Sequence, residues 1–122
     1  MENKKSTLVL GASDNPSRYS FLALNRLRAK GHPVNAIGKK KTRVGDVEIA
    51  DTKSEFKDID TVTLYLNPTN QQPYYDYILS LAPKRIIFNP GTENPELEKL
   101  AEEKGIETME ACTLVLLSTG QY

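Results

Sequence analysis

The sequence has 122 residues, a length that suggests one domain with one core and leaves no room for a separate substrate domain. Its 16 lysines and arginines balance its 16 aspartates and glutamates, so the overall charge gives no reason to expect a nucleic-acid partner. The single cysteine, Cys112, excludes an internal disulfide framework and suits a reducing compartment. There is no apolar stretch typical of a signal peptide, and no run approaches the roughly 20 apolar residues that span a bilayer. We therefore expect a cytoplasmic protein with no membrane partner.

The first half of the chain predicts two strands with a helix between them. Residues 6–11 are apolar and predict a buried strand that ends at Gly11. Residues 20–31 predict a helix that Gly31 ends, and residues 32–38 predict a second strand. Residues 38–60 are more polar and irregular, so we expect a loop there, with a short strand around Val47–Ile49.

The second half repeats the alternation of strand and helix. A third strand is predicted at 60–67, a helix with Pro73 in its first turn at 70–84, and a fourth strand at 85–89. The clearest helix is at 94–105, where Asn94 is the cap, Pro95 takes the first helical position and Gly105 ends the helix. A fifth strand at 106–110 and a short helix at 113–120 follow.

This order of elements predicts an α/β fold. Strands that alternate with helices form right-handed βαβ units, which here give a doubly wound, five-stranded, mostly parallel sheet with helices on both faces. In such a sheet, ligands bind beyond the carboxyl ends of the strands. The predicted strand ends are the segments 11–13, 37–39, 66–68, 89–92 and 110–112. The only histidine, His32, lies in a turn at the opposite edge, and no metal site can be built around it.

The segment VLGASDNPSRYS, residues 9–20, has features of a phosphate-binding loop. Gly11 allows a ligand to approach the backbone, and the start of the next helix offers unpaired N–H groups and a positive dipole end. Further donors are Ser13, Ser17, Arg18 and Ser20, beside Ala12. Pro16 and Arg18 stand where a dinucleotide fingerprint has its later glycines, so a tightly held pyrophosphate, as in NAD enzymes, is less well supported. An ordinary strand-to-helix turn is the alternative.

The segment IGKKKTR, residues 37–43, lies where an NAD site has an acidic residue for the ribose. It carries a basic cluster instead: Lys39, Lys40, Lys41 and Arg43. This favours a ribose with an extra phosphate, either the 2′-phosphate of NADP or the 3′-phosphate of coenzyme A, although a solvated basic loop is the plain alternative. Little chain remains after the fifth strand to place a nicotinamide ring against a substrate, and this favours coenzyme A.

Four segments resemble the small stand-alone CoA-binding domain proteins: VLGASDNPSRYS, YLNPTN, NPGTENPELEKLAEEKGIE and EACTLVLLSTGQY. The resemblance covers roughly residues 5–122. It implies a single Rossmann-like CoA-binding domain over residues 1–122, similar to that of the succinyl-CoA synthetase alpha subunit. It further implies that Gly11, Ala12 and Ser13 contact the CoA phosphates. Lys39, with its neighbours Gly38 and Lys40, would meet the phosphorylated ribose, and Asn67-Pro68 with Asn89 and Gly91 would line the adenine or pantetheine path.

We therefore expect a protein that binds the small-molecule nucleotide coenzyme A, or an acyl-CoA, without catalytic activity of its own. Two alternatives stay open. One is a small NADP- or acyl-CoA-dependent enzyme, or a redox protein, that uses Cys112 near the arriving ligand thiol. Free cysteines are usually buried, and the neighbouring Glu110 would raise the thiol pKa, which makes Cys112 a weak catalytic candidate. The other is a regulatory interaction protein with a degenerate nucleotide site, whose partner the sequence does not indicate.

Overall fold

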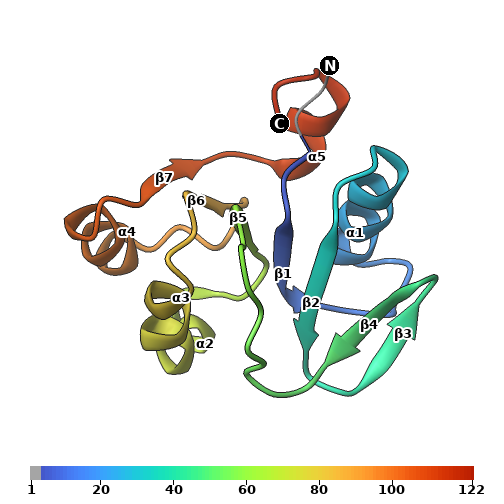
Figure 1. The fold of residues 1–122 in the computed structure, drawn as a ribbon, viewed down its shortest axis with the longest axis horizontal. Coiled ribbons are helices and arrows are strands. Elements are labelled where there is room, and N and C mark those ends of the chain that lie inside the picture. Colours follow the sequence, from blue (N-terminus) through green and yellow to red (C-terminus); the bar gives the residue numbers. More distant parts are fainter. Residues whose placement is uncertain (1–3) are drawn as a thin grey trace.

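The structure is a computed structural model that describes residues 4–122. Within these residues, seven strands form one sheet in the order β3-β4-β2-β1-β5-β6-β7 (Figure 1). The strands are β1 (Thr7–Ala12), β2 (Val34–Gly38), β3 (Thr42–Val44), β4 (Val47–Ala50), β5 (Thr61–Leu64), β6 (Arg85–Phe88) and β7 (Glu107–Glu110). Neighbouring strands run parallel, except that β3 and β4 are antiparallel. The mostly parallel α/β sheet is thus confirmed.

Helices cover both faces of the sheet. They are α1 (Tyr19–Ala29), α2 (Pro68–Gln71), α3 (Tyr75–Leu81), α4 (Pro95–Glu103) and α5 (Thr113–Ser118), with a 3₁₀ segment η1 (Gln72–Tyr74) between α2 and α3. On one face, Leu24 and Leu27 of α1 pack in one buried cluster with Val9 of β1. On the other face, Ile78 of α3 and Leu97 of α4 pack in a second cluster with the β1 residues Leu8 and Leu10. Alternate side chains of a strand point to opposite faces, so β1 contributes to both clusters.

The expected count of five strands is wrong, because residues 42–50 form a hairpin: the short strand expected around Val47–Ile49 is present as β4, and β3 was not expected. Val44, Val47 and Ile49 are buried, whereas Arg43 and Glu48, each next to one of them in the sequence, are exposed. This alternation is typical of a half-buried antiparallel pair, in which every second residue is polar. Gly45 has φ of +59° in the two-residue turn, a conformation that glycine adopts easily. The hairpin then pairs with β2 through β4, parallel to it.

The predicted helix at 70–84 begins earlier and is interrupted. It starts at Pro68, where Asn67 Oδ1 accepts a hydrogen bond of 2.9 Å from the N–H of Asn70. Pro73 lies in η1 rather than in the first turn, and it separates α2 from α3 because it has no N–H for the helical ladder. The helix predicted at 94–105 is confirmed as α4 with Asn94 as its cap.

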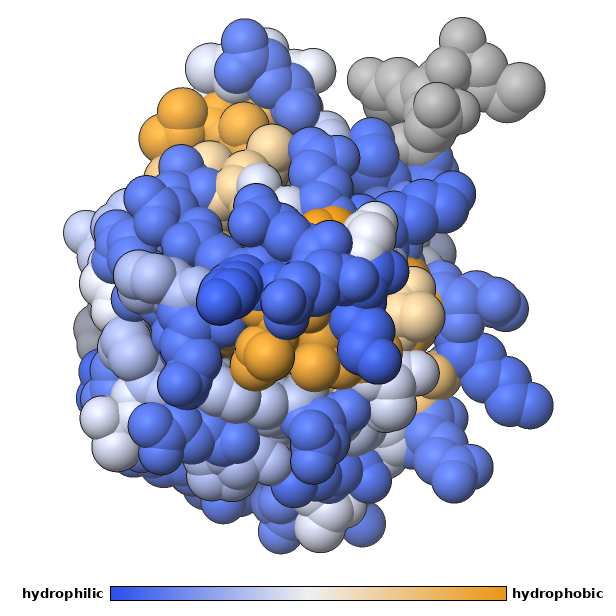
Figure 2. Space-filling model, turned by 90° about the vertical axis from the view of Figure 1, so that its left-hand side faces the viewer, coloured by the Kyte–Doolittle hydropathy of each residue, from blue (hydrophilic) through white to orange (hydrophobic). Residues whose placement is uncertain are grey.

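On the side of α3 and α4 the outer surface is mostly polar, but apolar side chains show at the top, near the middle of this face and towards its right-hand edge (Figure 2). Val115 of α5 is 54 % exposed. Among residues 4–122, no helix is long and apolar enough to cross a membrane. Nor do those residues bring three or more histidine, cysteine or carboxylate side chains together as a metal would require.

Candidate functional site

A cleft of about 940 Å³ opens at the carboxyl ends of β1, β2, β5 and β6. This is the topological switch point of the sheet: from β1 the chain adds β2 on one side and β5 on the other. This is the place where open α/β sheets bind ligands. Most of the residues predicted from the sequence line the cleft: Gly11, Ala12, Ser13, Ser17, Arg18, Ser20, Gly38, Lys39, Lys40, Asn67 and Gly91.

The loop after β1 owes its shape to Gly11 and to local hydrogen bonds. Gly11 has φ of +97°, and a Cβ there would lie 3.0 Å from the carbonyl carbon of Tyr65. Both facts exclude a side chain at this position. Beyond it, Ser13 Oγ accepts a hydrogen bond of 3.0 Å from the N–H of Asn15. Asn15 Oδ1 in turn accepts hydrogen bonds from Ser17, 3.0 Å from its N–H and 2.8 Å from its hydroxyl. The serines therefore shape the loop.

The helix that follows this loop opens onto the cleft without a side-chain cap. The N-cap position of α1 is Arg18, whose side chain makes no cap hydrogen bond. By contrast, Asn67 and Asn94 cap α2 and α4 with their side-chain oxygens. Tyr19 and Ser20, the first residues of α1, line the cleft. Uncapped N–H groups and the positive end of the helix dipole favour an anion at this point.

The ends of β1 and β2 approach one another closely where Gly38 pairs with Ala12. A Cβ on Gly38 would lie 2.3 Å from the carbonyl oxygen of Ala12, a distance that no side chain can adopt without moving the backbone. Lys40 follows at the rim, and its ammonium lies 3.4 Å from Asp14 Oδ2. The hydroxyl of Thr42 donates a 2.9 Å hydrogen bond to the same oxygen. That hydrogen bond, together with the charge of Lys40, holds the pKa of Asp14 below its usual range.

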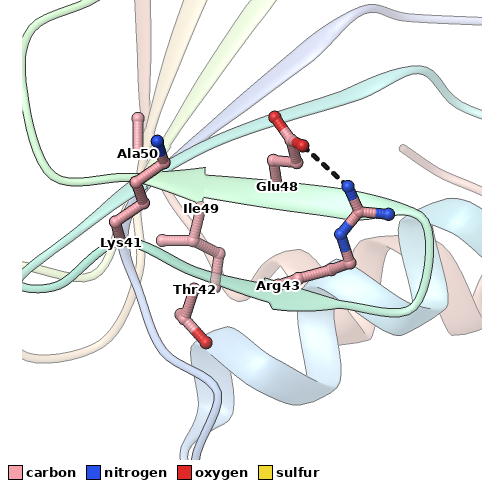
Figure 3. Close-up of a pocket in the computed structure, with 6 residues that line it drawn as sticks. All are labelled: Lys41, Thr42, Arg43, Glu48, Ile49 and Ala50. Carbon is pink, nitrogen blue, oxygen red and sulfur yellow. Dashed lines mark hydrogen bonds and ion pairs between the residues drawn. The ribbon is translucent and has the colours of Figure 1, made fainter.

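The structure divides the basic cluster that the sequence predicted. Lys39 and Lys40 line the cleft. Lys41 and Arg43 instead line a smaller pocket of about 330 Å³ on the β3–β4 hairpin (Figure 3). There Arg43 reaches across the hairpin to Glu48, with 2.7 Å between its nitrogen and the carboxylate oxygen. Only half of the cluster is therefore placed to meet a ligand in the cleft.

The far wall of the cleft carries no formal charge. It is formed by the residues that follow β5 and β6 and by residues of α2 and η1. These are Tyr65, Leu66, Asn67, Asn70, Tyr74, Pro90, Gly91 and Thr92. Every charged side chain that lines the cleft comes instead from the loops after β1 and β2: Asp14, Arg18, Lys39 and Lys40. The cleft thus has a charged end and a neutral end.

Three of the predicted residues do not line the cleft. Pro68 is the first residue of α2. Asn89 is buried, and its amide bonds the Thr63 hydroxyl and the Leu64 carbonyl at 2.7 and 2.8 Å, while its oxygen accepts from the N–H of Thr113 at 2.9 Å. It therefore fastens α5 to the sheet. Cys112 is half-buried at the N-cap position of α5.

Several cleft residues were missed from the sequence. Tyr74 lines the cleft and packs against Tyr77 with ring centroids 6.4 Å apart. Tyr65 follows β5, and burial raises its pKa to about 12. Asp14 follows β1 and Thr42 begins β3, so they meet only in the folded chain. Of these, only Tyr65 had a local signal, its position next to a predicted strand end.

We compared the sequence and the structure with those of known proteins and protein families. The model of the CoA-binding domain family matches residues 5–118. An uncharacterized protein of known crystal structure is 50% identical, with a TM-score of 0.96 over 99% of this chain and 100% of its own. A search of curated proteins found no match.

More distant solved structures show the same fold. A protein from Thermus thermophilus is 23% identical, with a TM-score of 0.83 over 98% of this chain and 91% of its own. A hypothetical protein from Pyrococcus horikoshii OT3 is 22% identical, with a TM-score of 0.86 over 95% of this chain and 83% of its own. Because the family model spans nearly the whole sequence, the chain belongs to the CoA-binding domain family.

Proposed function

We propose that this chain binds coenzyme A, or an acyl-CoA, in the cleft at the carboxyl ends of β1, β2, β5 and β6, and that it has no catalytic activity of its own. The division of the cleft into a charged and a neutral end carries this proposal. Coenzyme A is divided in the same way, since all its phosphates belong to the nucleotide half and its pantetheine arm is uncharged. Membership of the CoA-binding domain family supports the same ligand.

The proposed orientation follows from the charges. The pyrophosphate would lie on the loop after Gly11, against the uncapped start of α1. The 3′-phosphate would lie near Lys39 and Lys40, the cations on the rim. The arm would then run along the neutral wall past Asn67 and Gly91. In this arrangement each phosphate meets N–H groups or ammonium groups, and the amides of the arm meet uncharged polar side chains.

The enzyme alternatives gain no support from a specific contact. NADP would share the phosphate contacts, but its nicotinamide ring needs a substrate and a proton donor beside it. The neutral wall offers only tyrosines as donors, and burial raises the pKa of Tyr65 to about 12, which makes it a weak acid. A reaction at Cys112 requires a thiol within reach of the ligand. Cys112 is not among the residues that line the cleft.

A thermal-shift panel of coenzyme A, dephospho-CoA, NADP, NAD and ATP tests the proposal. A ligand that binds only the folded state stabilises it by RT ln(1 + [L]/Kd), about 2.7 kcal/mol at a hundredfold excess over Kd. We expect coenzyme A to give the largest rise in Tm and dephospho-CoA a smaller one. A larger rise with NADP, or none with millimolar coenzyme A, would overturn the proposal.

A further inference from the structure

The neutral wall of the cleft is held from behind by one buried amide. Gln71 is the last residue of α2, has no exposed surface and does not line the cleft. Its Nε2 donates two hydrogen bonds of 2.8 Å, one to the carbonyl of Leu66 and one to the carbonyl of Thr92. Leu66 and Thr92 both line the cleft, although 26 residues of chain separate them. The two N–H groups of one side chain thus join both strand ends that form the wall.

The side-chain oxygen of Gln71 also takes part in a hydrogen bond. Gln71 Oε1 accepts a hydrogen bond of 2.9 Å from Asn94 Nδ2. Asn94 caps α4 by accepting from the N–H of Leu97 at 3.2 Å, and it donates to the hydroxyl of Tyr75 at 2.8 Å. Because both donors and the acceptor are satisfied, the Gln71 side chain is fixed in one orientation.

The N–H and the hydroxyl of Thr92 close a local turn onto the carbonyl of Asn89, and the Gln71 amide joins this turn to Leu66, because neither segment is helix or strand. Leu66 and Asn67 follow the end of β5, and residues 89–94 connect β6 to α4 without helix or strand. Gly91, in that connection, has φ of +92°. The helix α2 has only four residues and cannot hold itself in place by its own ladder. A buried apolar side chain would fill the same space, but it would leave two carbonyls without donors.

From these contacts we infer that Gln71 is a positioning residue for the ligand: it holds Leu66 and Thr92 at the spacing that receives the uncharged arm of coenzyme A, and it leaves the phosphate end of the cleft untouched. The inference rests on the proposed function. It assigns no contact between Gln71 and the ligand, because the side chain lies behind the wall.

The test uses two ligands that share the 3′-phosphate and the 5′-phosphate next to the ribose; only coenzyme A carries the second 5′-phosphate and the arm. Calorimetric titration measures Kd for coenzyme A and for adenosine 3′,5′-bisphosphate, which lacks the arm, with the wild-type chain and with Gln71→Met and Gln71→Glu. We expect both variants to weaken coenzyme A about tenfold, which corresponds to ~1.4 kcal/mol, and to change the bisphosphate Kd less than twofold. Gln72→Met is the matched control, since Gln72 is the exposed neighbour and should leave both affinities unchanged.

An equal loss for both ligands, or no loss for either, would overturn the inference, because a merely structural role affects both or neither. Amide hydrogen exchange adds a readout that needs no ligand. The variants should exchange faster at residues 66–71 and 89–94 and at the wild-type rate in residues 11–20, and uniform acceleration would contradict the inference. If a variant does not fold, wild-type exchange decides: coenzyme A should protect 66–71 and 89–94, and the bisphosphate should not. A wild-type chain that binds neither ligand would refute the proposed function. The exchange pattern of the variants would still test whether Gln71 holds residues 66–71 and 89–94 in place.

Discussion

The ammonium of Lys40 lies 3.4 Å from the carboxylate of Asp14, across the mouth of the cleft. The hydroxyl of Thr42 donates to the same carboxylate oxygen, so Asp14 links the loop after β1 to the start of β3. The low pKa of Asp14 keeps this carboxylate ionised at neutral pH. A cation that the sequence assigns to a ligand phosphate therefore already has an anionic neighbour, and a bound phosphate must compete with it.

Replacing this anion should strengthen binding. Asp14→Asn removes a negative charge beside the proposed phosphate position and keeps an acceptor for Thr42. We expect the affinity for coenzyme A to rise about two- to fivefold, the scale of an exposed ion pair, and the effect to shrink as salt is added. Asp46→Asn is the control, because Asp46 pairs with Arg28 at the hairpin turn, away from the cleft. Weaker binding by Asp14→Asn would show instead that the carboxylate holds the ligand.

The two halves of the basic cluster should behave differently. Replacing Lys39 and Lys40 together by alanine should weaken coenzyme A about tenfold and dephospho-CoA much less, because only the former carries the 3′-phosphate. Arg43→Ala removes an exposed cation that is paired with Glu48 on the hairpin, and it should change neither affinity. Fluorescence or calorimetric titration at fixed salt compares the three proteins. Equal losses in both variants would mean that the charge acts only at long range.

The elements predicted correctly are those whose ends are marked by capping, proline or glycine residues in the local sequence. Asn94, Pro95 and Gly105 bound α4 within a few residues, because capping and positive φ depend on neighbouring residues only. Of the hairpin at 42–50, the strand expected around Val47–Ile49 is present as β4, whereas β3 was not predicted because the polar residues around it were taken as evidence for a loop. An apolar run is a stronger signal than an alternation only four residues long.

Some residues of the candidate site could be predicted from the local sequence, and others could not. The glycines, serines and lysines next to strand ends could be predicted, since the topology alone brings strand ends together. Gln71 could not, because its role depends on a contact with Thr92 that only the folded chain creates. For the same reason Asn89 was assigned to the ligand path, whereas its side chain crosslinks Thr63 and Thr113 inside the protein.

The close approach of β1 and β2 at Gly38 gives a prediction about stability. Gly38→Ala places a methyl group against the backbone oxygen of Ala12, 2.3 Å away before relaxation. We expect a loss of about 1–3 kcal/mol in the free energy of unfolding, as for other overpacked sites, together with weaker ligand binding. Gly45→Asn is the control, because nothing lies within 4 Å of a Cβ there and asparagine tolerates positive φ. Urea unfolding measures both, and an unchanged midpoint for Gly38→Ala would contradict the crowding.

Alkaline unfolding should report the buried phenol of Tyr65. Burial raises its pKa from 10.0 to about 12, against the opposing effect of the Thr63 and Thr113 hydroxyls. Below pH 10 the folded and unfolded chains both keep the proton, so its contribution to stability is fully present. Between pH 10 and 12 only the folded chain keeps it, and the free energy of unfolding falls by ~1.4 kcal/mol per pH unit. Tyr65→Phe should lack this part of the alkaline loss, and parallel curves for the two proteins would refute the shift.

The most direct test of the account is a calorimetric titration of the wild-type chain with coenzyme A and, in the same buffer, with dephospho-CoA. The account predicts one binding event per chain with coenzyme A and a clearly larger Kd for dephospho-CoA, because the cations at Lys39 and Lys40 lie at one end of the cleft. Equal affinities would show that Lys39 and Lys40 do not bind the 3′-phosphate. The absence of any binding by millimolar coenzyme A would contradict the central claim.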